Sequence, residues 1–292
     1  MKILKSAALA AAMTAAIAFT AVMTQGAAQA HAKATASGKT APVQAASGKA
    51  SSAKAPATMN ASKLPTDVID LPGGRKLEIS FIKHASLALN YDGIVIYVDP
   101  VASFQPYSDF KPDYAALDKA DFIFITHAHP DHLDPAVIKM LSKKGTQIIL
   151  NKESQQQLGS GMAMANGDVS TLPGGALKVT AVPAYNTTPG NEKFHPKGRD
   201  NGYILEFPGY RIYISGDTEV VPDEVCNPKA PIDIAFFSVN QPYTMTLDQA
   251  ATQARKLKPR ILYPIHYGTT DINKLPGMLE GSGIDVRIRQ MQ

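Results

Sequence analysis

The chain has 292 residues, a formal net charge of +4 at pH 7 and one cysteine, which excludes an intrachain disulfide framework. Residues 1–66 hold seven lysines and no acidic residue, so of the 29 lysines and arginines 22 remain beyond them, against 25 acidic residues, a net charge of −3. The rest of the chain is therefore not basic, and its charge does not favour nucleic-acid binding.

The first 30 residues have the pattern of a secretory signal peptide. Met1-Lys-Ile-Leu-Lys5 is a charged start, an Ala-rich apolar stretch runs to Met23, and Ala28-Gln-Ala30 is a small-x-small cleavage site. We expect cleavage after Ala30 and an exported protein, periplasmic or secreted. An uncleaved N-terminal membrane anchor is the alternative, although the apolar stretch is only marginally hydrophobic for a span of about 20 residues.

Residues 31–66 are rich in Ala, Ser, Thr, Lys, Gly and Pro, with almost no large apolar side chain. Such a segment cannot bury enough surface to offset its ordering entropy, which predicts a disordered linker. Residues 67–292 are long enough for one domain with a sizeable core. Cys226 lies between prolines in an expected loop, and a role for it as a metal ligand stays open.

Strand patterns dominate residues 67–292, with helical patterns interspersed, which predicts an α/β or α+β class. Strands are expected at 77–82, 86–90, 94–98, 122–125, 147–150, 177–182, 203–207, 211–214, 232–237 and 261–265. Helices are expected at 135–144, 152–158 and 247–256. Thr246 is a typical N-cap for the last helix, which has Asp248 in its first turn and ends in basic residues.

The strand patterns occur in two similar sets. Residues 86–99 and 202–217 each contain a strand, a tight turn, a second strand and then an aspartate, Asp99 or Asp217. An Asp-led strand follows each of them, at 121–126 and at 233–238. We therefore expect two sheets packed face to face with helices outside, and functional residues from both halves facing one cleft. Chance similarity of strand-turn-strand units is the alternative.

Thr-His-Ala-His-Pro-Asp-His at 126–132 directly follows a short apolar strand and holds three of the chain's seven histidines. If His127 and His129 continue the extended geometry, both rings point to one side of the strand and can bind one ion. Asp131 and His132 lie in the turn that follows and can reach a second ion. Imidazole nitrogens and carboxylate oxygens are typical ligands of zinc and similar ions.

Two further residues follow expected strands. Asp217 comes after the strand at 211–214, and His266 comes after the strand at 261–265. Strand ends at one edge of a layered sheet protein are where ligands gather. Both residues are therefore candidate metal ligands together with the 126–132 cluster.

The order of these residues resembles the metallo-β-lactamase superfamily over about residues 77–290. Its broad hydrolase branches fit better than the antibiotic-degrading enzymes, because of Asp99-Pro100 and the final Ile-His-Tyr-Gly. The resemblance implies a four-layer αβ/βα sandwich. It also implies two divalent metal ions, with zinc expected first and manganese or iron as alternatives.

By the same resemblance, His127 and His129 would bind the first ion, Asp131, His132 and His266 the second, and Asp217 would bridge the two. Asp131 would also orient a metal-bound water as the catalytic residue. The implied activity is that of a hydrolase using metal-bound hydroxide on an ester-type substrate: a phosphodiester, phosphate ester, lactone or carboxylic ester.

The sequence departs from the family pattern at the third histidine of the first ion. Asn186 stands where that histidine is expected, after the strand at 177–182. His195, nine residues further on, His84 and Asn186 itself are the candidate replacements. If His84 is not a ligand, it belongs behind the ligands or in the substrate cleft.

The long polar loop at 184–202 is expected to contact a small-molecule substrate. Tyr185, Lys193 and Arg199 are candidate contacts, with Lys197 beside them, and the cationic side chains would suit a phosphate or a carboxylate. Solvated surface charge is the alternative for these side chains. Two other functions stay open: a di-iron redox enzyme on the same fold, and a metal-binding protein without catalysis.

Overall fold

The computed structural model describes residues 64–102, 110–175 and 177–291. The expected signal peptide at 1–30 and nearly all of the expected linker at 31–66 lie outside these residues. The first strand begins at Thr66, one residue before the expected start of the domain. Within the described ranges, no helix combines the length and the apolar character that crossing a membrane requires.

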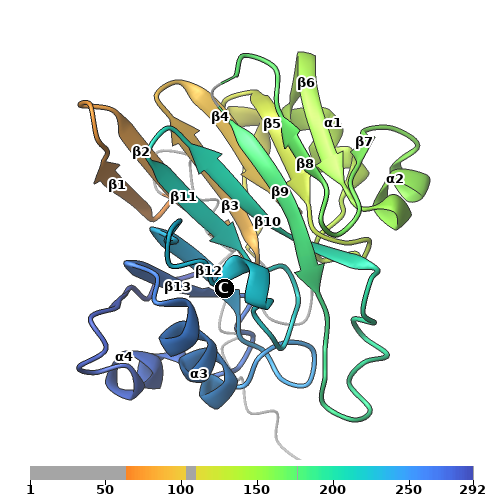
Figure 1. The fold of residues 1–292 in the computed structure, drawn as a ribbon. Helices are drawn as coiled ribbons and strands as arrows, with labels where there is room; N and C mark the ends of the chain where they lie inside the picture. Colours follow the sequence, from red (N-terminus) through yellow and green to blue (C-terminus); the bar gives the residue numbers. More distant parts are fainter. Residues whose placement is uncertain (1–63, 103–109, 176, 292) are drawn as a thin grey trace, which may run out of the picture. The chain divides into compact units, whose positions relative to one another are not determined.

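The described strands form two sheets of seven, and each sheet follows chain order (Figure 1). The first sheet contains β1 (Thr66–Asp70), β2 (Lys76–Lys83), β3 (Ser86–Tyr91), β4 (Ile94–Val98), β5 (Ala120–Ile125), β6 (Ser142–Leu150) and β7 (Met162–Ala163). The second contains β8 (Val169–Thr171), β9 (Lys178–Ala184), β10 (Asp200–Phe207), β11 (Tyr210–Ile214), β12 (Ile234–Ser238), β13 (Ile261–Ile265) and β14 (Asp285–Val286).

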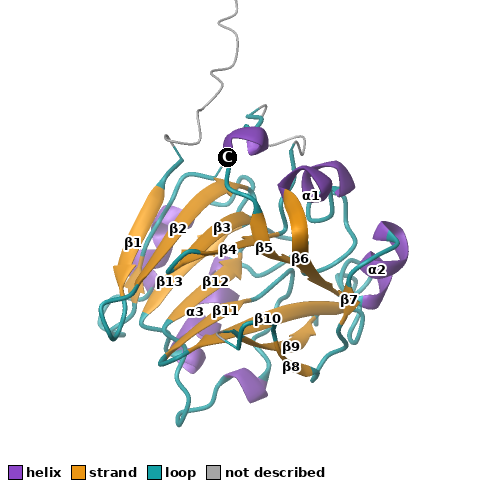
Figure 2. Ribbon diagram, turned by 90° about the horizontal axis from the view of Figure 1, so that it is seen from above, coloured by secondary structure: helices purple, strands orange, loops and turns teal. Residues whose placement is uncertain are grey.

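The described helices are short and lie outside the sheets. They are α1 (Pro135–Leu141), α2 (Lys152–Leu158), α3 (Leu247–Leu257) and α4 (Leu275–Met278), with 3-10 turns at Tyr114–Ala116, Asp223–Val225 and Ile272–Lys274. Figure 1 shows α3 and α4 beside β12 and β13, and Figure 2 shows α1 and α2 beside β6 and β7. Thr246 forms a capping box with Gln249 at the start of α3, as the sequence predicts for an N-cap.

The two sheets enclose the largest apolar core between them. Phe81 and Phe124 of the first sheet lie in the same core as Tyr203 and Tyr263 of the second. The ring of Phe81 is 5.0 Å from that of Tyr263, and the ring of Phe124 is 5.2 Å from that of Tyr203. Such tilted and T-shaped aromatic pairs add to the free energy gained by burying apolar area.

Separate apolar cores hold the helices against the outer faces of the sheets. Val137 and Leu141 of α1 pack with Ile125 of the first sheet, whereas Ala254 of α3 packs with Phe237 of the second. The order of layers is therefore helix, sheet, sheet, helix. This confirms the expected αβ/βα sandwich.

The internal repeat is also present in the backbone. Hairpin β3–β4 and hairpin β10–β11 are antiparallel, and each leads into a parallel strand, β5 or β12. The same hydrogen bond joins the hairpin to the following strand in both units. Asp121 accepts from the Val95 amide and Asp233 accepts from the Arg211 amide, each at 2.9 Å.

One detail of the predicted repeat was wrong, because the residue that corresponds to Asp99 is Ser215 and not Asp217. The Asp99 amide donates to Phe124 and the Ser215 amide to Phe236, the corresponding residue of β12. Likewise, the Asp99 carboxylate accepts from the Thr126 amide and the Ser215 hydroxyl from the Ser238 amide. Asp217 therefore lies two residues beyond the position that corresponds to Asp99.

The expected helix at 135–144 was also too long. Helix α1 ends at Leu141, and residues 142–144 begin β6. Ser142 pairs with Ala120 of β5, and the Thr146 hydroxyl donates to the Ala120 carbonyl at 2.6 Å. Pairing with the neighbouring strand overrides the helical propensity of the two lysines at 143 and 144.

Asp67 of β1 joins the first strand to the end of the described chain. Arg289 donates to it at 2.6 and 2.8 Å, and Tyr263 donates to it as well. Burial by itself raises the pKa of Asp67, but these hydrogen bonds bring it below the ordinary value of 3.8. The carboxylate therefore stabilises the fold above that value, and its contribution disappears as the pH falls through the lowered pKa.

We expect Asp67→Asn to lower the free energy of unfolding by about 2 kcal/mol at neutral pH, because charged hydrogen bonds are lost. Urea unfolding of both proteins measures this difference. The difference should stay constant above about pH 5 and shrink in more acidic solution. Equal stability of the two proteins at neutral pH would contradict this role of Asp67.

Candidate metal centre

The expected metal ligands lie on loops at one end of the two sheets. They come from the turn after β2 (His84), the loop after β5 (His127, His129, Asp131, His132), the loop after β9 (His195) and the ends of β11 (Asp217) and β13 (His266). The amide of Asn201 donates to the Thr126 carbonyl at 3.0 Å, which joins the loop after β5 to the second sheet. Candidate ligands from both halves therefore lie together at this end of the sheets, as the repeat predicts.

Three residues of this region have a left-handed backbone: His84 with φ of 55°, Asp99 with 42° and His266 with 50°. Such conformations cost of order 1–3 kcal/mol for a residue with a side chain, and they cluster at functional sites. The His84 carbonyl accepts from the His266 amide at 2.9 Å, so the two turns hold each other in place.

One group of three histidines can hold one ion. One ring nitrogen from each of His127, His129 and His195 lies within 4.8 Å of the others. Nδ1 of His195 donates to the buried carboxylate of Asp200 at 2.9 Å, which leaves Nε2 directed toward Asp217. A carboxylate behind a histidine fixes its tautomer and ring orientation for metal binding.

Of the three candidates for the missing histidine, His195 is the one that lies with His127 and His129. The Asn186 amide nitrogen instead donates to the carbonyls of Asn191 and Tyr243, at 3.3 and 2.7 Å. The Asn186 backbone amide donates to the His195 carbonyl at 2.9 Å. In these contacts Asn186 positions the loop that carries His195.

A second group contains His84, Asp131, His132 and His266, whose ligand atoms also lie within 4.8 Å of one another. Nδ1 of His132 donates to Asp99 at 2.8 Å, and Asp99 also accepts from the Thr126 amide and hydroxyl. Asp99 therefore orients His132 as Asp200 orients His195. Half-buried Cys226 belongs to neither group.

Asp217 connects the two groups. Its Oδ2 lies 3.8, 3.4, 3.5 and 3.2 Å from Nε2 of His127, His132, His195 and His266, respectively. Nε2 of His127, His132 and His266 and Oδ1 of Asp217 are buried without a hydrogen-bond partner. Such atoms cost about 1–3 kcal/mol each when nothing satisfies them. Their convergence fits divalent cations shared through Asp217.

The charges of the centre are strongly perturbed. Burial by itself lowers the pKa of His266, but the carboxylates of Asp217 and Asp131 raise it to about 9. The pKa of His132 rises well above its ordinary value for the same reasons. Burial opposes ionisation of Asp217, yet His266 and His132 hold its pKa well below the ordinary value. Protonated imidazoles thus balance the buried carboxylates when no cation is bound.

Binding of divalent cations should therefore release protons. Imidazole binds metal in its neutral form, so His132 and His266 must lose about two protons in total at neutral pH. Cation affinity should rise with pH while His132 and His266 lose their protons, and the pKa of His266 is about 9. Calorimetric titration with zinc in two buffers of different ionisation enthalpy measures the proton count, and equal heats in both buffers would contradict the expectation.

The expected substrate contacts lie along the loop after β9. Nζ of Lys193 lies 4.9 Å from the ring of Phe194, and Nζ of Lys197 lies 5.2 Å from the ring of Tyr185. Arg199 differs from these lysines, because its guanidinium donates twice to Asp200 at 2.8 Å.

Three buried acids that support the centre were not predicted as site residues: Asp99, Asp200 and Glu219. Glu219 accepts from the amides of Thr187 and Thr188 and from the Asn191 side chain, and so holds the start of the loop that carries His195. Each acid lies close in sequence to a ligand or at a strand end. The rule that a metal-binding histidine has a carboxylate behind it could have singled out Asp99 and Asp200.

Comparison with known proteins agrees with this fold and site. Residues 78–266 match the family described as Beta-lactamase superfamily domain, and the chain belongs to that family. Together with its relatives, this defines the protein as a metal-dependent hydrolase of the metallo-β-lactamase superfamily.

Individual proteins of known sequence or structure are similar to this chain. A UPF0173 metal-dependent hydrolase of Thermococcus onnurineus is 30% identical over 198 residues, which cover 66% of this chain and 85% of the relative. A crystal structure from Parabacteroides distasonis, assigned as a metal-dependent hydrolase, is 51% identical with a TM-score of 0.72, and covers 78% of this chain and 100% of that one. Igni18, a metallo hydrolase of Ignicoccus hospitalis, is 24% identical with a TM-score of 0.62 and coverages of 74% and 95%, and supports the fold alone.

Proposed function

We propose that this protein is an exported hydrolase that cleaves ester-type bonds in small, anionic molecules with the help of two divalent cations. The observation that carries the proposal is the position of Asp217, whose Oδ2 lies within 3.8 Å of four imidazole nitrogens from three separate segments. Neither a serine nor a cysteine nucleophile is required by this arrangement.

The cations would lower the pKa of a coordinated water and offset negative charge that develops on the substrate, with zinc expected first and manganese or iron as alternatives. His127, His129 and His195 hold the first position, and Asp131, His132 and His266 hold the second, with Asp217 shared. Asp131, whose side chain is 14% exposed against 3% for Asp217, faces solvent more than the other carboxylate. It would orient the attacking water by accepting its hydrogen bond.

The loop that carries His195 favours an anionic substrate. Lys193 and Lys197 are exposed on this loop, and Nη2 of Arg199 lies 3.5 Å from Nε2 of His129. The ring of Phe194 lies 4.9 Å from the ring of Tyr243, a residue that is 40% exposed. A cation beside the half-buried Phe194 and the exposed Tyr243 would suit a phosphate or carboxylate joined to an apolar group.

The activity is tested by zinc-loading the purified protein and measuring hydrolysis of nitrophenyl phosphate, bis-nitrophenyl phosphate, a lactone and nitrophenyl acetate. We expect turnover of at least one ester, lost on removal of metal and restored by zinc. Lys193→Ser with Lys197→Ser should raise KM about tenfold for an anionic ester, about 1.4 kcal/mol, and leave a neutral ester unchanged. The matched control is Lys139→Ser with Lys229→Ser, which removes two lysines away from the loop.

Two outcomes would overturn the proposal. Purified protein that contains iron and consumes oxygen without hydrolysing any ester would favour a di-iron redox enzyme. Protein that retains its metal through purification and turns over none of the esters would favour metal binding without catalysis.

Export is proposed from the sequence pattern of residues 1–30. Sequencing the N-terminus of the mature protein from the producing cells should give His31 as its first residue. A mature protein that still begins at Met1 and sediments with membranes would favour the anchor instead.

A further inference from the structure

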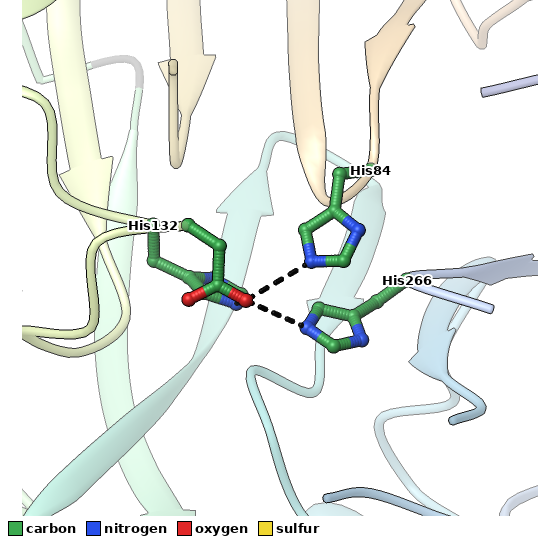
Figure 3. A group of neighbouring side chains, drawn as sticks. His84, His132 and His266 are labelled. Carbon is green, nitrogen blue, oxygen red and sulfur yellow. Dashed lines mark hydrogen bonds and ion pairs between the residues drawn. The ribbon is translucent and has the colours of Figure 1, made fainter. Parts of the chain in front are cut away.

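His84 lies in the second group of ligands, although the motif of the superfamily does not include it. Its Nε2 is 3.1 Å from Oδ2 of Asp131, and Nε2 of His266 is 3.4 Å from the same oxygen. The His84 ring is 3.8 Å from the ring of His266 and 5.9 Å from that of His132. In Figure 3 the rings of His84 and His266 lie next to each other, and both face His132.

These separations fit one ion better than one hydrogen bond. An ion with bonds of about 2.0–2.2 Å to nitrogen and oxygen places neighbouring ligand atoms about 3–3.5 Å apart. The two contacts to Oδ2 of Asp131 fall in that interval. A hydrogen bond from His84 to Asp131 accounts for one contact. It does not account for the imidazoles of His266 and His132, whose Nε2 atoms lie 3.4 and 3.8 Å from the same oxygen.

The backbone around His84 holds the ring in this position. His84 has φ of 55°, its amide donates to the Met291 carbonyl at 2.7 Å, and its carbonyl accepts from the His266 amide at 2.9 Å. The side chain is 2% exposed, so the ring cannot turn to solvent without opening this turn. The strained backbone and the burial hold the ring in one position before an ion binds, as expected for a preorganised ligand.

We infer that His84 binds the second cation, so that His84, Asp131, His132 and His266 hold it together with the shared Asp217. The first cation has three histidines and Asp217. The inference rests on the proposed function for the presence of a second cation. It predicts that the second position, with more protein ligands, fills first.

The test uses the full-length chain loaded with cobalt, whose visible absorption reports the ligands around the ion. We expect two cobalt ions per wild-type chain. In His84→Gly, the cobalt bound first should change its absorption and bind more than about 100-fold more weakly, because loss of an outer partner alone costs about 10–100-fold. Added imidazole should restore the wild-type absorption by occupying the place of the missing ring.

Glycine suits the left-handed backbone of His84, so the variant should fold. The matched control is Lys258→Gly, since Lys258 also has φ of 55° but ends α3 and is exposed. The control should keep the cobalt absorption of the wild type. Unchanged absorption in His84→Gly, or a change that imidazole does not reverse, would overturn the inference.

Failure of the inference and failure of the proposed function are distinguishable in the same preparations. If the wild type binds two cobalt ions and His84→Gly has unchanged absorption, His84 is not a ligand, and the proposed hydrolase function is unaffected. If the wild type binds two ions and His84→Gly shows the expected change in absorption, but no ester is hydrolysed, His84 is a ligand and the proposed hydrolase function is wrong.

Discussion

Asp217→Asn is expected to prevent binding of both cations and to lower ester hydrolysis about 1,000-fold or more, equal to about 4 kcal/mol of transition-state stabilisation. The reason is geometric, because Oδ2 of Asp217 lies between the two groups of histidines, 3.2–3.8 Å from four Nε2 atoms. Asparagine keeps the size of the side chain but cannot carry the charge that two cations share. Metal content by elemental analysis and initial rates measure the two effects.

The matched control is Asp233→Asn. Asp233 precedes β12 and accepts from the Arg211 amide at 2.9 Å, outside the metal centre. This variant should lose some stability and keep its metal and its turnover per folded molecule. If Asp217→Asn retained two cations per chain, Asp217 would not be the shared ligand.

Asp131→Asn is expected to have a narrower effect: one cation should remain bound. Asp131 contacts His84 and His266 of the second group, at 3.1 and 3.4 Å, and is absent from the first group. Turnover should fall at least about 100-fold, since the variant loses both the second cation and the carboxylate that orients water. Equilibrium dialysis against zinc, followed by rate measurements at saturating zinc, separates the two losses.

The reciprocal variant is His195→Ala. It removes a ligand from the first group and should leave the second cation in place, so that each variant retains a different ion. Cobalt absorption distinguishes the two remaining sites. If Asp131→Asn bound two cations and kept wild-type turnover, the assignment of the second position would be wrong.

The layered architecture could be predicted from the sequence because the strand patterns are strong and repeat. Strands β4 and β13 and helix α2 have the expected bounds. Apolar runs explain the two strands, whereas the N-cap Asn151 and the left-handed Gly159 set the ends of the helix. Short edge strands such as β1 and β14 were not predicted, since they carry few apolar residues and depend on a neighbouring strand.

The ligands close to one another in sequence could be predicted, whereas the choice among distant ones could not. Residues 127–132 lie in one motif, so their spacing alone places them together. His195 and His84 depend on how two loops fold, on the Asp200 contact of one and the left-handed turn of the other. No local pattern shows that these two loops meet the 127–132 motif, because they lie far from it in the chain.

The equivalence of Asp99 and Asp217 failed for a physical reason. Both aspartates follow a hairpin, but the second hairpin is extended by Gly216, whose φ is 60°. A side chain there would come within 2.6 Å of the Asn201 carbonyl, so glycine is required for the close approach of the chain. The turn moves Asp217 beyond the position of Asp99, into the space between the two groups of histidines.

Anomalous diffraction from crystals of the zinc-loaded protein tests the arrangement most directly. Two peaks are expected, one bound by His127, His129 and His195 and the other by Asp131, His132 and His266, with the Asp217 carboxylate between them. A single peak that leaves either group without metal at saturating zinc, or peaks that bypass Asp217, would contradict a centre of two cations shared through that residue.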